Sequence, residues 1–279
     1  MSLLSNRQLR VRLLPGAVEA ALWRGWPRPV KIADQRCPVD VRDGDALAST
    51  LDIALAKLAQ DGAPTKDAVL HAELADAIVH FDVASGNFAG QSQRQLRAFA
   101  NACVVELLGD ATREHSVHWQ MQSDEQHLLV CAVPNAVLRA LTSAAATHAM
   151  RLAGIRPSFA RAWNRHARRS TGRNLVFASV AGLNAMIACA HNGVVNAVSS
   201  GPWGEECAAG ESQVTRLRSG FGLLDVGEHA LLDLQVDRLL ASLGFDATRD
   251  ADFLFVSAGE PPPLLSNRWT IVQASGVGA

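Results

Sequence analysis

The sequence predicts an α/β protein made of two duplicated lobes, each a β-β-β-α-β-α unit, and three observations support this. Residues Val11–Gly25 and Phe177–His191 share one pattern, an apolar run, a glycine turn and a second apolar run, when Gly16 is set over Gly182. In both halves apolar residues at helical spacing follow, which indicates a helix after the strands. The 279 residues and the hydrophobic content of 48% suit two lobes with separate cores.

In the N-terminal half, strands on either side of Pro15-Gly16 lead to a helix after Asp43-Gly44-Asp45, where Asp45 can cap the start and Gly62 lies past the end. The apolar face of this helix consists of Leu47, Leu51, Ala54, Leu55 and Leu58. A second helix, over residues 91–107, is expected to bury the stripe Leu96, Phe99, Cys103 and Leu107. The other elements predicted here are strands over 68–73, 77–83, 117–122 and 128–133, a helix from Pro134 to Gly154 that buries His148 and Leu152, a short strand near Ile155 and a basic helix over 158–169.

The C-terminal half opens with a segment, residues 174–204, that has no charged side chain. A membrane helix needs about 20 predominantly apolar residues, and Gly182, Asn184 and the hairpin signal Asn192-Gly193 interrupt this segment. It therefore predicts three buried strands, over 174–180, 184–190 and 194–199.

Helices over residues 205–220 and 228–243 and strands over 253–256 and 268–272 complete the predicted C-terminal half. The lobes would span residues 1–170 and 171–279 and join near residues 168–173. A cleft between two such lobes is the default ligand site.

The composition argues against several classes of protein. The formal net charge of −1 provides no global field that would attract nucleic acid. The N-terminus lacks a sustained apolar stretch and a cleavage site of the secretory kind. The five cysteines are widely and irregularly spaced, without a CxxC pair, so we expect reduced thiols in a cytoplasmic protein rather than disulfides or a zinc site. His115, His118 and His127 are expected to be loop histidines, not metal ligands.

Three stretches carry a resemblance to a known family. They are LLPGAVEAALWRG at residues 13–25, VHFDVASGNFAGQSQRQLRAFA at 79–100 and LAGIRPSFARAWNRHARR at 152–169. Over about its first two-thirds the chain resembles PilM-type and MshI-type pilus-assembly proteins and the cytoplasmic domains of GspL-type secretion proteins. These belong to the actin-like ATPase superfamily, so the resemblance implies two actin-like, ribonuclease H-like lobes.

The resemblance also implies where a nucleotide would bind. Active members of the superfamily use an Asp in the first turn of each lobe and a glycine-rich loop after a late strand. Here the first turn offers Gly16 and the second Gly182, both without Asp, and the late loop keeps only Ser257 and Gly259. Each lost charge-assisted contact costs about 1.5–3 kcal/mol. We therefore expect a vestigial nucleotide cleft at these four residues, with no catalytic residue, no cofactor and no metal.

The function that the resemblance implies is that of a non-enzymatic cytoplasmic scaffold of a type IV pilus or type II secretion-like apparatus. It would bind a short cytoplasmic segment of an inner-membrane partner, reach the membrane only through that partner and bind no nucleic acid. The alternative is an ATP-binding kinase or ATPase of the same fold. A third interpretation is an unrelated duplicated α/β fold with another ligand.

Four residues are candidates for contact with the partner. Phe88 lies in a Ser/Gly/Asn loop after a predicted edge strand, and we expect it to be exposed, so that Phe88→Ala leaves the melting temperature unchanged. Trp26 stands beside two prolines, and its two interpretations are an exposed peptide-docking edge and a tryptophan that closes a core. Trp163 and Arg165 belong to a basic run over residues 161–173. The alternative for this run is a solvated helix end with Trp163 packed inward.

Overall fold

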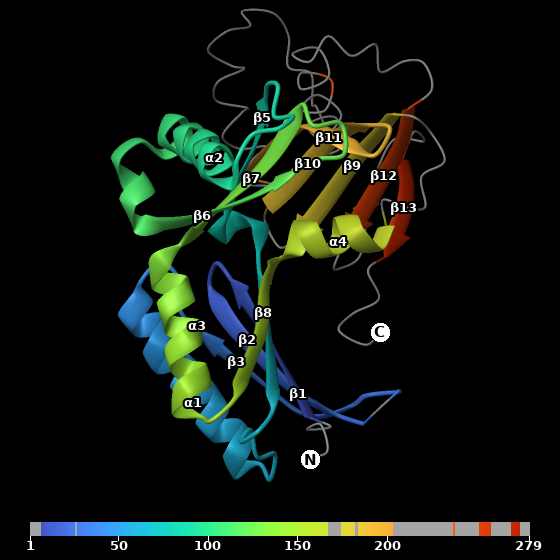
Figure 1. Cartoon of the computed structure of the whole chain (residues 1–279). Coiled ribbons are helices and arrows are strands. Elements are labelled where there is room, and N and C mark those ends of the chain that lie inside the picture. The colour runs from blue at the N-terminus through green and yellow to red at the C-terminus, as the bar shows by residue number, and fades with distance from the viewer. Residues whose placement is uncertain are drawn as a thin grey trace, which may run out of the picture. The chain divides into compact units, whose positions relative to one another are not determined.

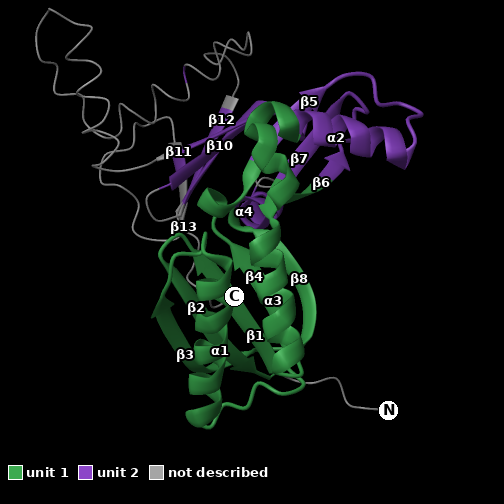
Figure 2. Ribbon diagram, turned by 90° about the vertical axis from the view of Figure 1, so that its left-hand side faces the viewer, with its two compact units in different colours: residues 1–80, 104–118, 132–158 green, residues 81–103, 119–131, 159–279 purple. Residues whose placement is uncertain are grey.

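The computed structural model describes residues 7–25, 27–166, 174–181, 184–202, 237, 251–257 and 269–273 (Figure 1). It is a mixed α/β structure, as predicted, that divides into two compact units (Figure 2). Unit 1 comprises residues 1–80, 104–118 and 132–158, and unit 2 comprises residues 81–103, 119–131 and 159–279. The predicted junction near residues 168–173 lies outside the described residues.

The described α-helices and strands follow one another in the order that the sequence predicts, with two 3₁₀ turns in addition. Up to β4 they are β1 (Arg7–Leu14), β2 (Ala17–Arg24), β3 (Val30–Pro38), α1 (Gly44–Gln60) and β4 (Val69–Leu74). Up to α3 they are η1 (Asp76–Ile78), β5 (His80–Ser85), α2 (Gln93–Leu108), η2 (Gly109–Glu114), β6 (His115–Met121), β7 (His127–Pro134) and α3 (Asn135–Thr147). The remainder are β8 (Arg151–Pro157), α4 (Ser158–His166), β9 (Asn174–Ala181), β10 (Asn184–His191), β11 (Val194–Pro202), β12 (Ala251–Ser257) and β13 (Trp269–Gln273).

Two five-stranded sheets have the same topology. The sheet of unit 1 has the order β3-β2-β1-β4-β8, and that of unit 2 has the order β11-β10-β9-β12-β13. In both, the first two pairings are antiparallel and the last two are parallel. The predicted duplication of the three-strand unit is confirmed, whereas the two helices predicted over 205–220 and 228–243 lie outside the described residues.

The strand registers correct the predicted alignment of the lobes by one residue. Leu14 pairs with Ala17 and Ala181 pairs with Asn184, so each hairpin has a two-residue loop. Pro15, not Gly16, is therefore equivalent to Gly182. Equivalent residues of the two hairpins therefore differ by 167 in residue number. An irregularity in each sheet supports this offset, because the register shifts between Leu22 and Trp23 in one lobe and between Cys189 and Ala190 in the other.

Unit 1 buries one face of its sheet under α1 and α3, which lie side by side over the strands (Figure 2). Leu9, Val11 and Leu13 of β1 face this core, and all five apolar residues predicted for α1 are buried. The N-cap of α1 is Asp43 rather than Asp45, because the Asp43 carboxylate accepts from the backbone N–H groups of Asp45 and Ala46, both at 3.0 Å.

The segment between β4 and α3 contains a three-stranded sheet, β5-β7-β6, and the helix α2. Residues 76–78 form a short 3₁₀ turn, so the strand predicted from residue 77 begins only at His80. The buried row of α2 is Leu96, Ala100 and Val104, with Cys103 half-buried. The predicted stripe was wrong for Phe99 and Leu107, which are 47% and 48% exposed.

Helix α3 ends at Thr147, seven residues before the Gly154 that the sequence suggested. His148 caps it, and its ring nitrogen Nε2 lies 3.2 Å from the Asp52 carboxylate. Ala149 has a positive φ of 50°, which turns the chain out of the helix. Leu152 consequently belongs to β8 and not to the helix.

Unit 2 packs α4 against one face of its sheet. Phe159 and Trp163 of α4 contact Phe177 of β9, with ring centroids 5.8 and 5.4 Å apart. Met186 of β10 and Leu254 and Val256 of β12 belong to the same core. The charge-free segment forms strands as predicted, and none of the described helices combines the length and apolarity that a membrane crossing needs.

Candidate functional site

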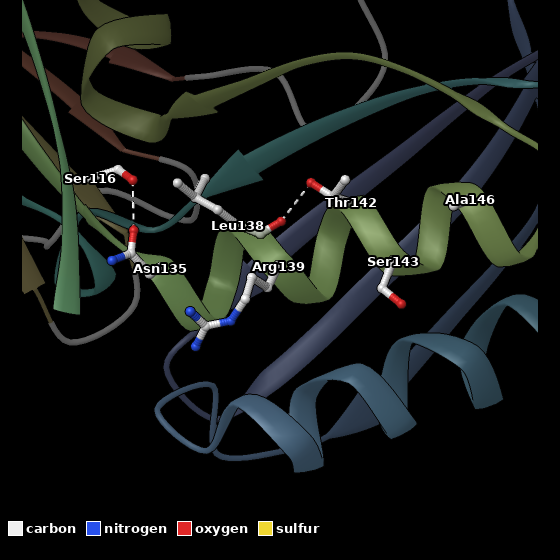
Figure 3. A pocket seen from close by; sticks show the side chains of 7 residues that line it. All are labelled: Ser116, Asn135, Leu138, Arg139, Thr142, Ser143 and Ala146. Carbon is white, nitrogen blue, oxygen red and sulfur yellow. Dashed lines mark hydrogen bonds between the residues drawn. The ribbon is translucent and has the colours of Figure 1, made fainter.

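An open groove runs along the solvent face of α3 in unit 1 (Figure 3). Its volume is about 550 Å³. The lining residues recur at helical spacing on α3, with one more from β6, and they are Asn135, Leu138, Arg139, Thr142, Ser143, Ala146 and Ser116. The opposite face of α3 carries Val137, Ala140, Leu141, Ala144 and Ala145, which are buried. The amphipathic pattern of α3 therefore places small and polar side chains in the groove.

Polar contacts fix the end of the groove at the start of α3. The Ser116 hydroxyl donates to Oδ1 of Asn135 at 2.6 Å, and Nδ2 of Asn135 donates to the carbonyl of Arg113 at 3.3 Å. The Thr142 hydroxyl donates to the carbonyl of Leu138 at 2.8 Å, one turn back along the helix. The hydroxyls of Ser116 and Thr142 are thus already hydrogen-bonded within the protein, which fixes the orientation of these two side chains in the groove.

The electrostatics of the groove depend on Arg139. It is the single charged residue among those that line the groove, and it is exposed. Within the part of the chain that the structure describes, no carboxylate lies within ion-pair distance of its guanidinium. A guanidinium matches a carboxylate with two parallel hydrogen bonds, so this position favours an acidic group in a ligand.

The position of α3 depends on a close approach to α1. A Cβ atom added to Gly44 would lie 2.8 Å from Cβ of Ala136, closer than real side chains approach. Gly44 therefore allows the start of α1 to contact the start of α3. Ala136 stands next to Asn135 of the groove, so this contact places one end of the groove.

The residues predicted for a nucleotide cleft are only partly described. Gly16 lies in the β1–β2 loop, where its carbonyl accepts from the backbone N–H of Val39 at 3.1 Å. Ser257 ends β12. Gly182 and Gly259 lie outside the described residues. The vestigial cleft stays a prediction, and its support remains the absence of Asp from the two hairpin turns in the sequence.

The residues predicted to contact a partner have different outcomes. The prediction that Phe88 is exposed was wrong, because its side chain is 2% exposed and contacts the ring of Phe99. Trp163 is half-buried in the core of unit 2, which agrees with the alternative that it packs inward. Arg165 is exposed on α4. Trp26 lies outside the described residues.

The described histidines His115 and His127 each pair with a neighbouring side chain. The rings of His80 and His115 are 5.6 Å apart, and burial together with the neighbouring His115 lowers the pKa of His80. Nδ1 of His127 contacts the Asp124 carboxylate. Across the described ranges, no group of three or more His, Cys, Asp or Glu residues is placed to hold a metal ion.

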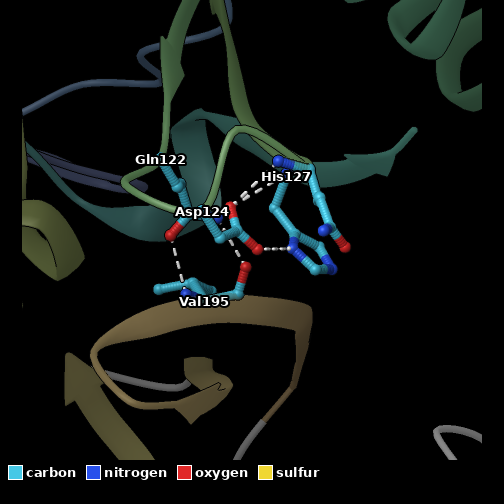
Figure 4. A network of polar contacts seen from close by, with 5 residues as sticks. Gln122, Asp124, His127 and Val195 are labelled. Carbon is cyan, nitrogen blue, oxygen red and sulfur yellow. Dashed lines mark hydrogen bonds and ion pairs between the residues drawn. The ribbon is translucent and has the colours of Figure 1, made fainter. Parts of the chain in front are cut away.

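A second polar network joins the β6–β7 turn to β11 in unit 2 (Figure 4). The side-chain amide of Gln122 donates to the carbonyl of Val195 at 2.6 Å and accepts from its N–H at 2.7 Å. Burial alone would raise the pKa of Asp124, but hydrogen bonds from the His127 side chain and from the backbone of Gln126 and His127, with the charge of His127, lower it. The network is structural, because its polar groups are engaged with one another.

The sequence did not predict the groove on α3. Its lining residues were visible only as the polar side of a predicted amphipathic helix, a pattern that every surface helix shares. The contribution of Ser116, 19 residues before Asn135, depends on the pairing of strands rather than on any local motif.

Comparison with solved structures identifies the fold. A Bacteroides thetaiotaomicron protein of unknown function with an actin-like ATPase fold superposes with a TM-score of 0.56 at 10% identity, covering 93% of this chain and 84% of that one. The PilM–PilN type IV pilus biogenesis complex gives a TM-score of 0.56 at 14% identity, with 90% and 81% covered. No family model and no curated protein matches the sequence.

The cytoplasmic domain of EpsL, an inner-membrane component of the type II secretion system of Vibrio cholerae, gives a TM-score of 0.52 at 10% identity, with 95% and 90% covered. At these identities the likeness establishes the fold. Together with the two sheets of identical strand order, it shows that this chain has the actin-like ATPase fold, shared with PilM and with the EpsL cytoplasmic domain.

Proposed function

We propose that the protein is a cytoplasmic scaffold of a type IV pilus or type II secretion-like assembly, and that the groove on α3 binds a short segment of an inner-membrane partner. The observation that carries the proposal is an open groove of small side chains with one cation, Arg139, in a fold shared with the PilM of a PilM–PilN complex. The protein would reach the membrane through this partner.

The groove indicates the chemistry of the segment. The side chains of Leu138 and Ala146 offer apolar surface, and each Å² of it removed from water stabilises a complex by about 25 cal/mol. At one end, the Asn135 and Ser116 side chains are already hydrogen-bonded to each other, so the main polar contact of the peptide is expected at Arg139. A short peptide with small apolar side chains and an acidic group opposite Arg139 would match this lining.

We also propose that the protein is not an enzyme and does not hydrolyse ATP. The support is the first hairpin loop, Pro15-Gly16, which has no carboxylate to organise a metal ion for phosphoryl transfer. Calorimetric titration with Mg·ATP should show no affinity of millimolar strength or better, and hydrolysis should stay at background. Micromolar binding of Mg·ATP would favour the alternative of an ATP-binding kinase or ATPase.

The groove is tested with three variants and a synthetic peptide. The partner is recovered from solubilised inner membrane of the native host, and its short cytoplasmic segment is synthesised and titrated. Thr142→Trp fills the groove and should abolish binding, and Arg139→Glu should weaken it at least tenfold. Ser49→Trp places the same bulk on exposed α1 and should bind like the wild type.

The titration has outcomes that contradict the groove assignment. If Thr142→Trp and Ser49→Trp bind the segment equally well, the segment binds elsewhere. If Arg139→Glu binds as tightly as the wild type, no acidic group of the segment contacts Arg139. Melting temperatures of all three variants establish that the comparison is made between folded proteins.

A further inference from the structure

The outer face of the sheet of unit 1, opposite α1 and α3, differs from its counterpart in unit 2. The counterpart is apolar and holds α4. With the offset of 167 that the hairpins and the irregularities give, its residues can be compared one by one. Leu175, Phe177, Met186, Leu254 and Val256 of unit 2 correspond to Gln8, Arg10, Glu19, His71 and Glu73 of unit 1.

This exchange makes the outer face of unit 1 unsuitable for an apolar helix such as α4. A helix that presents Phe159 and Trp163 would bury Arg10, Glu19 and Glu73 away from water, and the desolvation of charges is costly. Among the described residues of unit 1, α1 and α3 both lie on the other face (Figure 2). The outer face is therefore built for a polar neighbour.

Acidic and basic side chains occupy different parts of this face. The carboxylates lie near its centre, where Arg12 contacts Glu19 at 3.2 Å and Glu73 at 3.8 Å, and Arg36 contacts Glu19 at 3.5 Å. Towards the β8 edge the side chains are mainly basic, with Glu73 beside Arg156 as the exception. Strand pairing aligns Arg10 with His71, Val69 with Arg151, and Glu73 with Arg156, so these basic residues share the face.

The basic residues at the β8 edge are close enough to act together. Partial burial and the charges of Arg10, Arg156 and Arg151 lower the pKa of His71, as expected for a group within their common positive potential. Arg151 and Arg156 are exposed. Because the whole chain has a net charge of −1, this concentration of cations is local and not a general property of the surface.

We propose that this basic edge, formed by Arg10, Arg151 and Arg156, binds an acidic segment of a protein partner, at a surface distinct from the groove on α3. Because β4 lies between β1 and β8, their arginines are separated by about two strand spacings of about 4.8 Å. Carboxylates at alternate positions of an extended peptide are about 7 Å apart, so a short acidic peptide can span both strands. Anionic membranes usually attract clusters of four to eight Lys or Arg residues, and here two are exposed.

The proposal is tested by fluorescence anisotropy with a labelled hexaglutamate peptide, at low and at physiological salt. The double variant Arg151→Gln/Arg156→Gln should weaken binding about fourfold to tenfold, since each exposed ion pair contributes up to about a fivefold change. Arg94→Gln removes an exposed charge from α2 and should bind as the wild type does. Binding should weaken with added salt.

Four outcomes would overturn the proposal. The first is no binding of hexaglutamate by the wild type, and the second is an equal loss in the α2 control and the double variant. The third is a loss with Arg139→Gln but not with Arg151→Gln/Arg156→Gln, which would assign the acidic peptide to the groove on α3. Sedimentation with vesicles of 30% phosphatidylserine tests the membrane, and vesicle binding that depends on Arg151 and Arg156 without peptide binding would also refute it.

Discussion

The hydrogen bonds between the Gln122 side chain and Val195 of β11 give the most direct test of what stabilises unit 2. Gln122→Ala removes two hydrogen bonds to the backbone of Val195, with donor–acceptor distances of 2.6 and 2.7 Å. Val195 is 2% exposed, so water cannot easily replace the side chain. At about 0.5–1.5 kcal/mol net for each hydrogen bond, the variant should lose about 1–3 kcal/mol of stability. With a urea slope of about 2 kcal/mol per molar, the midpoint should fall by about 0.5–1.5 M.

Gln120 provides a matched control, because it is exposed on β6, two residues before Gln122, and Gln120→Ala should leave the midpoint unchanged. Gln122→Glu is a sharper variant, since a carboxylate can accept from the Val195 N–H but cannot donate to its carbonyl. Hydrogen exchange of the Val195 amide should accelerate in both Gln122 variants. Equal urea midpoints for Gln122→Ala and Gln120→Ala, with unchanged exchange at Val195, would refute the assignment of stability to this contact.

Three further predictions follow from burial and charge. Phe88→Ala should lower the free energy of unfolding by about 3–5 kcal/mol in urea titrations, because Phe88 is 2% exposed; a change below 1 kcal/mol would contradict its place in the core. The folded protein holds the pKa of His71 below its ordinary 6.5. Protonation of His71 therefore favours the unfolded state, and stability should fall as pH drops below about 6.5. On this acidification, His71→Gln should lose less stability than the wild type or a His118→Gln control. Burial raises the pKa of Cys189 to about 12, so iodoacetamide at pH 8 should not label it until the protein unfolds, as peptide mass mapping would show; rapid labelling in the native state would be inconsistent with this burial.

The strand pattern was predictable because alternation and turn residues are local. The alignment of the lobes nevertheless missed by one residue, because it matched Gly16 with Gly182. The two loops, Pro15-Gly16 and Gly182-Leu183, place glycine at different positions, and only the pairing of the flanking strands shows which residues are equivalent. A shift of one residue exchanges the two faces of a strand, so the contrast between the outer faces could not be seen from the sequence.

Side-chain burial in loops and on helices was harder to predict. The loop around Phe88 is rich in small residues, which suggests exposure, yet the ring packs on Gly86 and against Phe99. For α2, two neighbouring rows of apolar residues are available, and hydrophobicity does not decide which faces the sheet. The structure buries the row through Ala100, and Phe99 is 47% exposed.

The absence of a side chain at Gly44 affects where α3, and therefore the groove on α3, can lie. Its single hydrogen atom acts as the spacer between α1 and α3, since a methyl group there would meet Ala136 at 2.8 Å. Alanine favours a helix over glycine by up to about 1 kcal/mol, so Gly44→Ala sets a local gain against a forced displacement of α3 by several tenths of an ångström. The position of α3, and of the groove that it lines, thus depends on Gly44, a residue outside the groove lining.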